Sequence, residues 1–379
     1  MRKQNLPALA AVQFEHLEPR TLFSTAESVA LPPPVGSAPD RAHLSSLLGL
    51  LPAKPTLVAS AVPANGDNNP YGVTIISNTF ATGGALKAGD VLVSYFNDKA
   101  GLQGTGTTIV SIAPNGRQTT FFQGPKGLGL TTALGVLQSG FVLVGNVPAP
   151  DGTHVNGSGS MLVLDKNSKI VASLTDLALL DGPWDLTIED QGTKASVFVS
   201  NVLNGTVTRL RLSLDAHTDS VRVISEATIA SGYTFRTDPA ALVIGPTGLA
   251  FDRTTGELFV ASTGDNAIYE IPDASVRTTQ VTKGTLVYQD SSHLRGPLGL
   301  TFAGDNLITA NGDAVNADPT GQQNSELVEF TLNGEFVDQF QIDPTLGGAF
   351  GLAFAQFHYQ TSFAAVNDVT NTLDEWILP

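Results

Sequence analysis

Short apolar runs separated by turn residues recur along the chain from about residue 56 to the end. The runs alternate apolar and polar positions or are rich in β-branched residues, as in DVLVSYFND (90–98), ASVFVSN (195–201) and NLITANGD (306–313). Gly-containing turns follow many of them, and alternation bounded by such turns is typical of short β-strands joined in hairpins. The pattern therefore predicts an all-β fold.

A Pro/Gly-apolar signature returns six times and divides these strands into units. Its members are NPYGVTI (69–75), PKGLGLTT (125–132), GPWDLTI (182–188), GPTGLAF (245–251), GPLGLTF (296–302) and GAFGLAF (348–354). Aligned on Gly72, Gly129, Asp185, Gly248, Gly299 and Gly351, they are 57, 56, 63, 51 and 52 residues apart. Units of this length have room for four strands each. We therefore expect a six-bladed β-propeller over residues 54–379.

The last unit contains only three apolar runs before the chain reaches Pro379, so its blade needs a strand from elsewhere. The segment TLVASAV (56–62) precedes the first signature and has the composition of a strand. If it joined the last blade, the ring would be closed and would leave no open end. We predict that residues 56–62 form this closing strand.

The N-terminal segment differs in composition from the rest. Arg2 and Lys3 precede a short apolar stretch at 6–12, a truncated version of a secretory signal. The following FEHLEPRTLFS (14–24) resembles the LEPR-xLL motif found near the N-termini of extracellular and cell-surface proteins of planctomycete bacteria. The matching positions are Glu15, Leu17, Glu18, Pro19, Arg20 and Leu22, with Phe23 in place of the second Leu. The resemblance implies that residues 1–24 are a leader that directs the protein to the cell surface or outside the cell.

Residues 25–53 join this leader to the propeller. Pro32–Pro34 and the surrounding Ser and Ala residues cannot bury a core, so we expect a disordered linker here. HLSSLLGLL (43–51) has the pattern of a short amphipathic helix at the end of the linker.

The repeated units resemble NHL repeats, most closely in GPTGLAF, GELFVA and GDNAIYEI within residues 245–271. NHL-type propellers bind proteins, carbohydrates or RNA, and some related six-bladed propellers are metal-dependent lactonases or lyases. The resemblance therefore implies a propeller and leaves a choice between binding and catalysis, since fold alone does not decide function.

Charge and composition narrow that choice. The net charge of −15 and the pI of about 4.6 disfavour nucleic acids and anionic membrane surfaces. The absence of Cys excludes disulfides, thiolate metal sites and Cys nucleophiles. No apolar stretch reaches the roughly 18 residues of a membrane span. We expect a monomer that binds a protein or a glycan at the cell surface, without a nucleic-acid partner.

In such blades the loops that enter the innermost strands and those that leave the second strands open on one face, around one mouth of the central channel. The candidate ligand-binding residues at this mouth are Asn97, Asn146, Trp184, Asp185, Asn201, Asp265, Asn311 and Asn367. Each Asn or Asp has the alternative of bonding only its own turn. Trp184 could stack on a flat ligand or fill a gap between blades. The longest loops, where a partner surface would form, are 147–159, 213–244 and 312–325.

A metal site at the mouth would need converging carboxylates, because neutral amides are weak calcium ligands. The candidate metal ligands, with calcium as the cofactor, are Asp185, Asn201, Asp265 and Asp313. Gluconolactonase-type propellers carry a Glu at the start of the first innermost strand, where this chain has Asn68-Asn69-Pro70.

His154 and His293 are the histidines on the mouth side, and we interpret both as exposed loop residues rather than general bases. We assign no catalytic residues and expect a non-enzymatic binding scaffold. The alternative is a metal-dependent hydrolase, lactonase or lyase with its site in the same mouth.

Overall fold

The computed structural model describes residues 46–175, 178–357 and 360–379 of the protein. The leader with its LEPR-type motif and the linker up to residue 45 lie outside this part of the chain. The described residues belong to one compact unit, Leu44–Pro379. No helix among them is long and apolar enough to cross a membrane.

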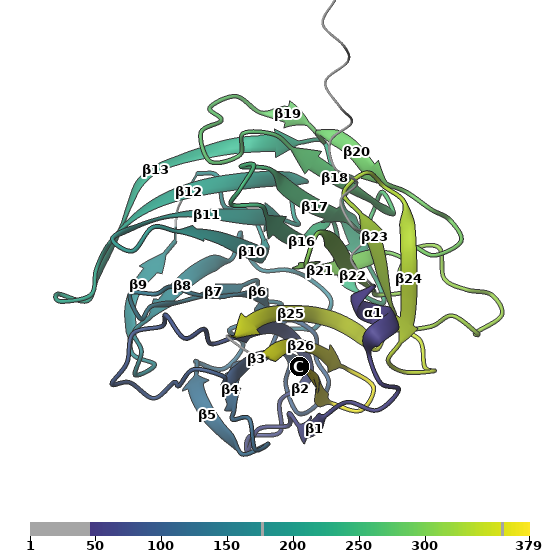
Figure 1. Ribbon diagram of the computed structural model, residues 1–379. Coiled ribbons are helices and arrows are strands. Elements are labelled where there is room, and N and C mark those ends of the chain that lie inside the picture. The colour runs from purple at the N-terminus through teal and green to yellow at the C-terminus, as the bar shows by residue number, and fades with distance from the viewer. Residues whose placement is uncertain (1–45, 176–177, 358–359) are drawn as a thin grey trace, which may run out of the picture. The chain divides into compact units, whose positions relative to one another are not determined.

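Six sheets are arranged like blades around a central axis (Figure 1). In the first five blades the first strand in sequence is innermost. The first three blades are β2 (Asn68–Ile75), β3 (Val91–Asn97), β4 (Thr108–Ile112), β5 (Gln118–Gln123); β6 (Leu130–Val136), β7 (Val142–Asn146), β8 (Ser160–Leu164), β9 (Ile170–Leu174); and β10 (Pro183–Asp190), β11 (Lys194–Asn201), β12 (Thr206–Asp215), β13 (Ser220–Ser231). The next two are β16 (Pro246–Phe251), β17 (Leu258–Ser262), β18 (Ala267–Ile271), β20 (Thr285–Tyr288); and β21 (Pro297–Ala303), β22 (Asn306–Asn311), β23 (Glu326–Thr331), β24 (Phe336–Gln341). The short β19 (Val281–Thr282) adds a parallel edge to β13. The predicted six-bladed propeller is confirmed.

The sixth blade is built from both ends of the described chain. Its inner strands are β25 (Ala349–Phe357), β26 (Gln360–Asn367) and β27 (Thr372–Leu378), and its outermost strand is β1 (Leu57–Ser60). β1 runs antiparallel to β27, with Leu57 opposite Glu375 and Ser60 opposite Thr372. Ala59 packs into the core between the sixth and first blades, whereas Val58 is exposed. The predicted closing strand is thus confirmed.

The repeated signature marks the places where neighbouring blades meet. All six innermost strands have a shift in register near their start, after the first paired residue in five of them and after the second, Pro70, in β2. A Cβ atom added to Gly351 would lie 2.1 Å from the Tyr71 carbonyl oxygen, and one added to Gly248 would lie 2.2 Å from that of Leu298. Because only a residue without a side chain permits this approach, the glycines let adjacent innermost strands come together around the axis.

The structure corrects two details of the repeat. In the second blade, the pairing of Leu134 with Val144 makes Ala133, rather than Gly129, the equivalent of the other signature glycines. Gly129 belongs to the turn before β6, and it resembles the signature glycine only in its sequence context. The predicted loop 213–244 contains β13, the outermost strand of the third blade. The residues after β13 leave the blade and form the small hairpin of β14 (Arg236–Asp238) and β15 (Leu242–Ile244).

The helix predicted at 43–51 is present as the short α1 (Leu47–Leu50), and residues 43–45 lie outside the described part. Its N-terminus rests on the buried carboxylate of Glu329 in β23, which accepts hydrogen bonds from the Leu47 and Leu48 amides and from Ser46 Oγ. Leu48 is buried against the fifth and sixth blades. The segment before the propeller is therefore attached to the fifth blade.

Candidate functional site

One pocket of about 380 Å³ occupies the mouth of the channel. It is lined by residues near the start of innermost strands, among them Asn69, Trp184 and Phe350, and by residues after the second strands, such as Asp313 and Asp368. The prediction that these two sets of loops share a face is confirmed. The β14–β15 hairpin adds Ala240 and Ala241 to the wall, and Gln103 Nε2 of the first blade donates a hydrogen bond of 2.9 Å to the Ala240 carbonyl.

Packed aromatic rings underlie this mouth pocket. The Tyr71 ring lies between those of Phe96 and Phe350, with ring centroids 4.6 and 4.4 Å away. Trp184 presents an edge-to-face contact to Tyr71 and to Phe96. Tyr71, Phe96 and Trp184 are buried, whereas Phe350 remains partly accessible. Of the two interpretations of Trp184, the structure shows the one in which the indole fills the space between blades, while it still contributes to the pocket lining.

Several oxygen acceptors at the mouth lack partners. Asn69 Oδ1, Asn97 Oδ1 and Asp313 Oδ1 are buried and accept no hydrogen bond from the described residues. The other oxygen of Asp313, Oδ2, accepts from the Ser325 and Gly347 amides at 2.9 and 3.0 Å. Buried acceptors are normally satisfied. These atoms are therefore candidates for contact with a ligand.

The two carboxyl groups of the mouth are also electrostatically unusual. Neither Asp313 nor Asp368 forms an ion pair within the described part of the chain, and no Lys, Arg or His lines the pocket there. Burial raises the pKa of Asp313 above its ordinary value and raises the pKa of Asp368 to about 6. A cation that reached the pocket would stabilise both carboxylates in their charged form.

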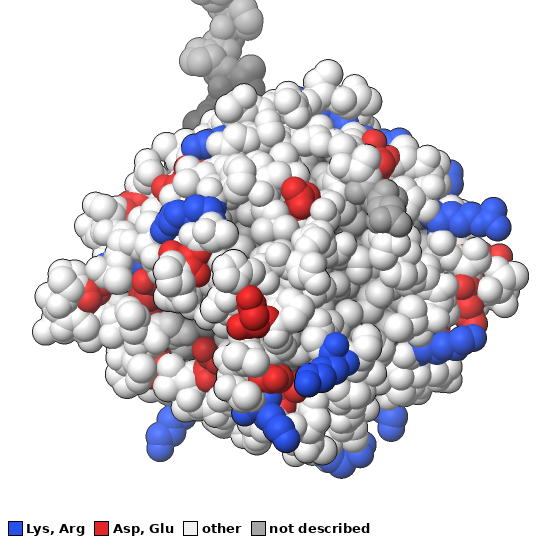
Figure 2. All heavy atoms as spheres, turned by 180° about the vertical axis from the view of Figure 1, so that it is seen from behind, with Lys and Arg blue, Asp and Glu red and all other residues white. Residues whose placement is uncertain are grey.

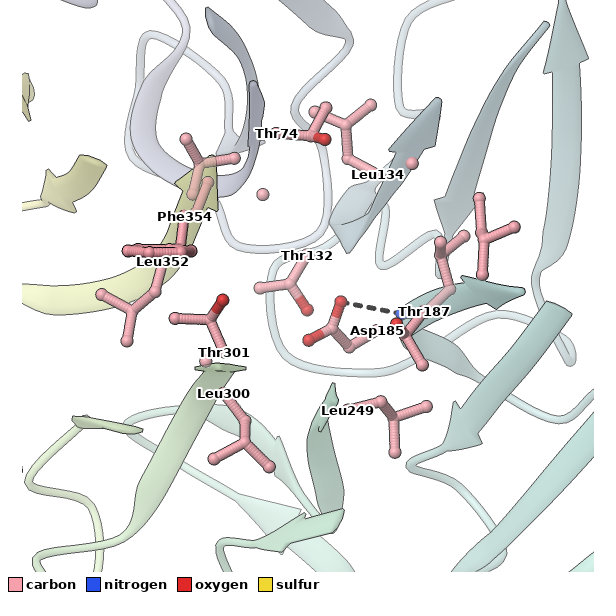
Figure 3. Close-up of a pocket in the computed structure, with 18 of the residues that line it drawn as sticks. Thr74, Thr132, Leu134, Asp185, Thr187, Leu249, Leu300, Thr301, Leu352 and Phe354 are labelled. Atoms are coloured by element: carbon pink, nitrogen blue, oxygen red, sulfur yellow. Dashed lines mark hydrogen bonds between the residues drawn. The ribbon is translucent and has the colours of Figure 1, made fainter. Parts of the chain in front are cut away.

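Asp185 lies in a different compartment, the channel itself. This cavity of about 240 Å³ is lined by the innermost strands of all six blades. Figure 3 shows the Asp185 carboxyl group near the side chains of Thr132 and Thr301, with a hydrogen bond of 2.7 Å from the Leu186 amide. Asp185 is partly accessible from the channel, and desolvation by the surrounding protein raises the pKa of its carboxyl group well above the ordinary value.

The other predicted mouth residues are engaged in bonds to neighbouring strands and loops. Asn201 donates to the Leu179 carbonyl and accepts from the Asp181 amide. Asn311 holds the Arg295 amide, and Asp265 forms an ion pair of 2.8 Å with Lys283. Asn146 donates to Ser160, and Asn367 donates to Asp343 and accepts from the Thr370 amide. Of the eight ligand-binding candidates, Asn97 and Trp184 line the mouth pocket.

The four predicted metal ligands are not brought to one point. Asp185 faces the channel, Asp313 faces the mouth, Asn201 is occupied by Leu179 and Asp181 of the preceding loop, and Asp265 is occupied by Lys283. Residues 46–175, 178–357 and 360–379 contain no group of three or more His, Asp and Glu that could hold a metal. The arrangement of these four side chains does not fit a calcium site.

The two mouth-side histidines differ from each other. His154 is exposed, as predicted, and pairs with Asp151 in its loop. His293 is partly buried, because its ring stacks on Phe336 and its Nδ1 bonds to Asp290. The expectation of an exposed residue was wrong for His293. Neither histidine lines the mouth pocket.

Sequence reasoning missed Asn69 and Tyr71 as pocket residues, and it placed Asp368 beside the polar ring of the mouth without naming it a candidate ligand. Asp368 directly follows Asn367, one of the predicted ring residues, and the pair ND ends the run 361–368. The pattern located the junction, but it could not tell which of two adjacent polar residues bonds the turn and which faces the pocket.

Comparison with known proteins gives a fold and no family. No protein-family model and no curated protein matches the sequence. Among solved structures, a gluconolactonase from Xanthomonas campestris is similar, with a TM-score of 0.51 and 13% identity over 86% of this chain and 91% of that chain. A protein named as a glucose dehydrogenase from Thermus thermophilus is similar with a TM-score of 0.50 and 13% identity over 84% of this chain and 99% of that chain. The Malassezia sympodialis allergen Mala s 1 is also similar, with a TM-score of 0.50 and 13% identity over 86% of this chain and 95% of that chain. Likeness at this identity establishes the shared propeller fold.

Proposed function

We propose that the protein is an exported, NHL-like propeller that binds a protein or a glycan at the cell surface through its mouth pocket. The observation that carries this proposal is the set of buried, partnerless oxygen acceptors above a packed aromatic layer. The leader with its resemblance to the LEPR-xLL motif supports the cell-surface location.

The physical properties of the pocket favour binding. Its volume of about 380 Å³ lies within the range of small-ligand sites. An unsatisfied buried acceptor costs about 1–3 kcal/mol, so a ligand that donates hydrogen bonds to Asn69, Asn97 or Asp313 recovers part of that free energy on binding. The stacked rings are already in place, so little ordering is needed when the ligand arrives.

The binding proposal is tested by filling the pocket. Ala240 is an exposed residue of the pocket wall, and an indole at this position would occupy the mouth. Wild-type protein and the Ala240→Trp variant are applied to arrays of peptides and glycans, with Ala216→Trp in the exposed β12–β13 turn as the matched control. We expect binding that Ala240→Trp abolishes and Ala216→Trp retains. Equal binding by all three proteins would place the ligand elsewhere and contradict the proposal.

A second candidate, hydrolysis of a lactone, is favoured by Asp368. Its carboxyl group has a pKa of about 6 and receives no hydrogen bond from the described residues, which suits a general base. In this reaction Asp368 takes a proton from water, the hydroxide adds to the lactone carbonyl, the ring C–O bond breaks, and the proton passes to the departing alkoxide. A structural neighbour is named as a gluconolactonase.

The test of this candidate is the rate of glucono-δ-lactone ring opening with wild-type protein and with Asp368→Asn. Turnover that is lost in the variant supports hydrolysis. A wild-type rate equal to the buffer rate excludes this lactone as a substrate and leaves the binding proposal in place.

Export is tested separately by cell fractionation. We expect the full chain at the cell surface or in the medium, and we expect a chain lacking residues 1–24 to stay in the cytoplasm. Recovery of the intact full chain only from the cytoplasm would refute the role assigned to the leader.

A further inference from the structure

The mouth pocket combines two carboxylates with an apolar rim. Asp313 is only 5% exposed, lines the pocket and keeps Oδ1 without a partner, while Asp368 lines it without an ion pair. Leu346 is 51% exposed and is itself part of the pocket lining. Leu102, 41% exposed, lies between two lining residues, Gly101 and Gln103.

This pattern calls for a positively charged ligand. A neutral sugar would gain hydrogen bonds to the acceptors, but it would form no ion pair with Asp313 or Asp368; Asp313 is under the longer-range influence of Arg295 without forming an ion pair with it. An ammonium or guanidinium group has only donors, carries the opposite charge and matches acceptor-rich lining. In the view of Figure 2 several acidic side chains and one basic side chain lie in the middle part of the face, and most Lys and Arg lie toward the edge. The net charge of −15 further favours the approach of a cation.

The apolar rim indicates that the cation belongs to a larger partner. Leu346 and Leu102 are exposed at the pocket, where they are available to residues that flank an inserted side chain. Val369, 40% exposed, follows Asp368 and extends the apolar surface of the sixth blade. Phe350 is the one accessible ring of the aromatic layer within the described pocket, and it is placed to contact the alkyl stem of a long cationic residue.

We propose that the mouth pocket receives a Lys or Arg side chain from an exposed peptide segment of a protein partner. Asp313 and Asp368 pair with the charged group, Asn69 and Asn97 accept its remaining hydrogen bonds, and the apolar rim contacts the residues on either side. This inference rests on the proposed binding function and specifies the chemistry of the partner.

The test compares peptide libraries that differ at one position. Fluorescent libraries with fixed central Lys, Arg or Gln and random uncharged flanks are titrated with the full-length protein. Charge-assisted hydrogen bonds of about 1.5–3 kcal/mol correspond to roughly 10–100-fold in affinity. We expect the Lys and Arg libraries to bind at least about 10-fold more tightly than the Gln library, and this preference to fall as salt concentration rises.

Substitutions at the mouth test whether the preference for Lys and Arg arises there. Asp368→Asn removes a charge from a side chain that has no hydrogen bond within the described part of the protein, so we expect the variant to fold normally. The substitution should reduce the affinity for the Lys library about 10-fold or more. Asp305→Asn removes an exposed charge from the β21–β22 turn and is the control, with affinity unchanged. Asp313→Asn should repeat the loss, with thermal unfolding recorded alongside.

Three results would overturn the inference: equal affinity for the Lys and Gln libraries, affinity unchanged by Asp368→Asn, or n-butylamine binding as tightly as the Lys library. The last of these would assign the pocket to free amines. None of these results contradicts the proposed function. A ligand that binds wild-type protein but not the Ala240→Trp variant would still show that the mouth is a binding site.

Discussion

The mouth pocket and the channel lie on one axis, and both contain acidic side chains, yet they are built on opposite principles. The channel is lined by the innermost strands, and Asp185 there accepts a hydrogen bond from the adjoining Leu186 amide. The mouth is lined by strand ends and loops, and Asn69 Oδ1, Asn97 Oδ1 and Asp313 Oδ1 are left without partners there, although Asp313 Oδ2 accepts from two amides. A buried carboxyl group is therefore a candidate for ligand contact where one of its oxygens lies at a pocket and has no partner, as Asp313 Oδ1 does.

The aromatic layer lies at the base of the mouth, and removing part of it should have the largest effect. Trp184→Ala deletes a buried indole that packs on Tyr71 and Phe96, so we expect a loss of about 3–5 kcal/mol in the free energy of unfolding, measured in urea. Phe235→Ala, at a ring that is 49% exposed, is the control and should change stability by less than about 1 kcal/mol. A small effect of Trp184→Ala would mean that the layer is not a structural element.

The seam between the sixth and first blades should be the next most sensitive. Gly351→Ala directs a methyl group at the Tyr71 carbonyl oxygen, 2.1 Å away, and backbone atoms cannot move aside easily. We expect a loss of about 1–3 kcal/mol. Gly135→Ala is a matched change on another innermost strand, where the nearest atoms are methyl groups of Leu186 and Ile188 that can shift. Equal stability of the two variants in urea would contradict this explanation of the signature.

The smallest effect should come from the channel carboxyl group. Burial raises the pKa of Asp185 above 3.8 in the folded protein, so its protonated form favours folding at low pH and this contribution is lost as pH rises through the folded-state pKa. Asp185→Asn stays neutral and can still accept from the Leu186 amide. The variant should match wild type at low pH and exceed it in stability at neutral pH, as measured by urea unfolding at several pH values. A variant less stable than wild type at neutral pH would show that the charged form is the favoured one.

The fold could be predicted because each blade repeats the same local chemistry. Strand alternation, turn glycines and the register shift at each signature all recur, and the unfilled place in the last unit required β1. For the candidate site, only the face of the propeller on which it lies could be predicted. Asn201 and Asn311 have the same sequence context as Asn97, but their side chains bond to loops that approach from the neighbouring segment, as the Asp181 and Arg295 amides do. Such contacts depend on loop conformation, which no periodicity encodes.

The pairing of β1 with β27 also has a consequence for how the molecule acquires its structure. Leu57 and Glu375 are partners although 318 positions separate them (375 − 57), so this contact is among the most non-local in the chain. Contacts of this kind form slowly, since a long loop must close first. Five blades can assemble from neighbouring segments as the chain emerges, but the ring stays open, with β1 unpaired, until β27, the last strand, is available. Truncation at either end of the propeller should therefore produce an aggregation-prone open form rather than a smaller folded protein.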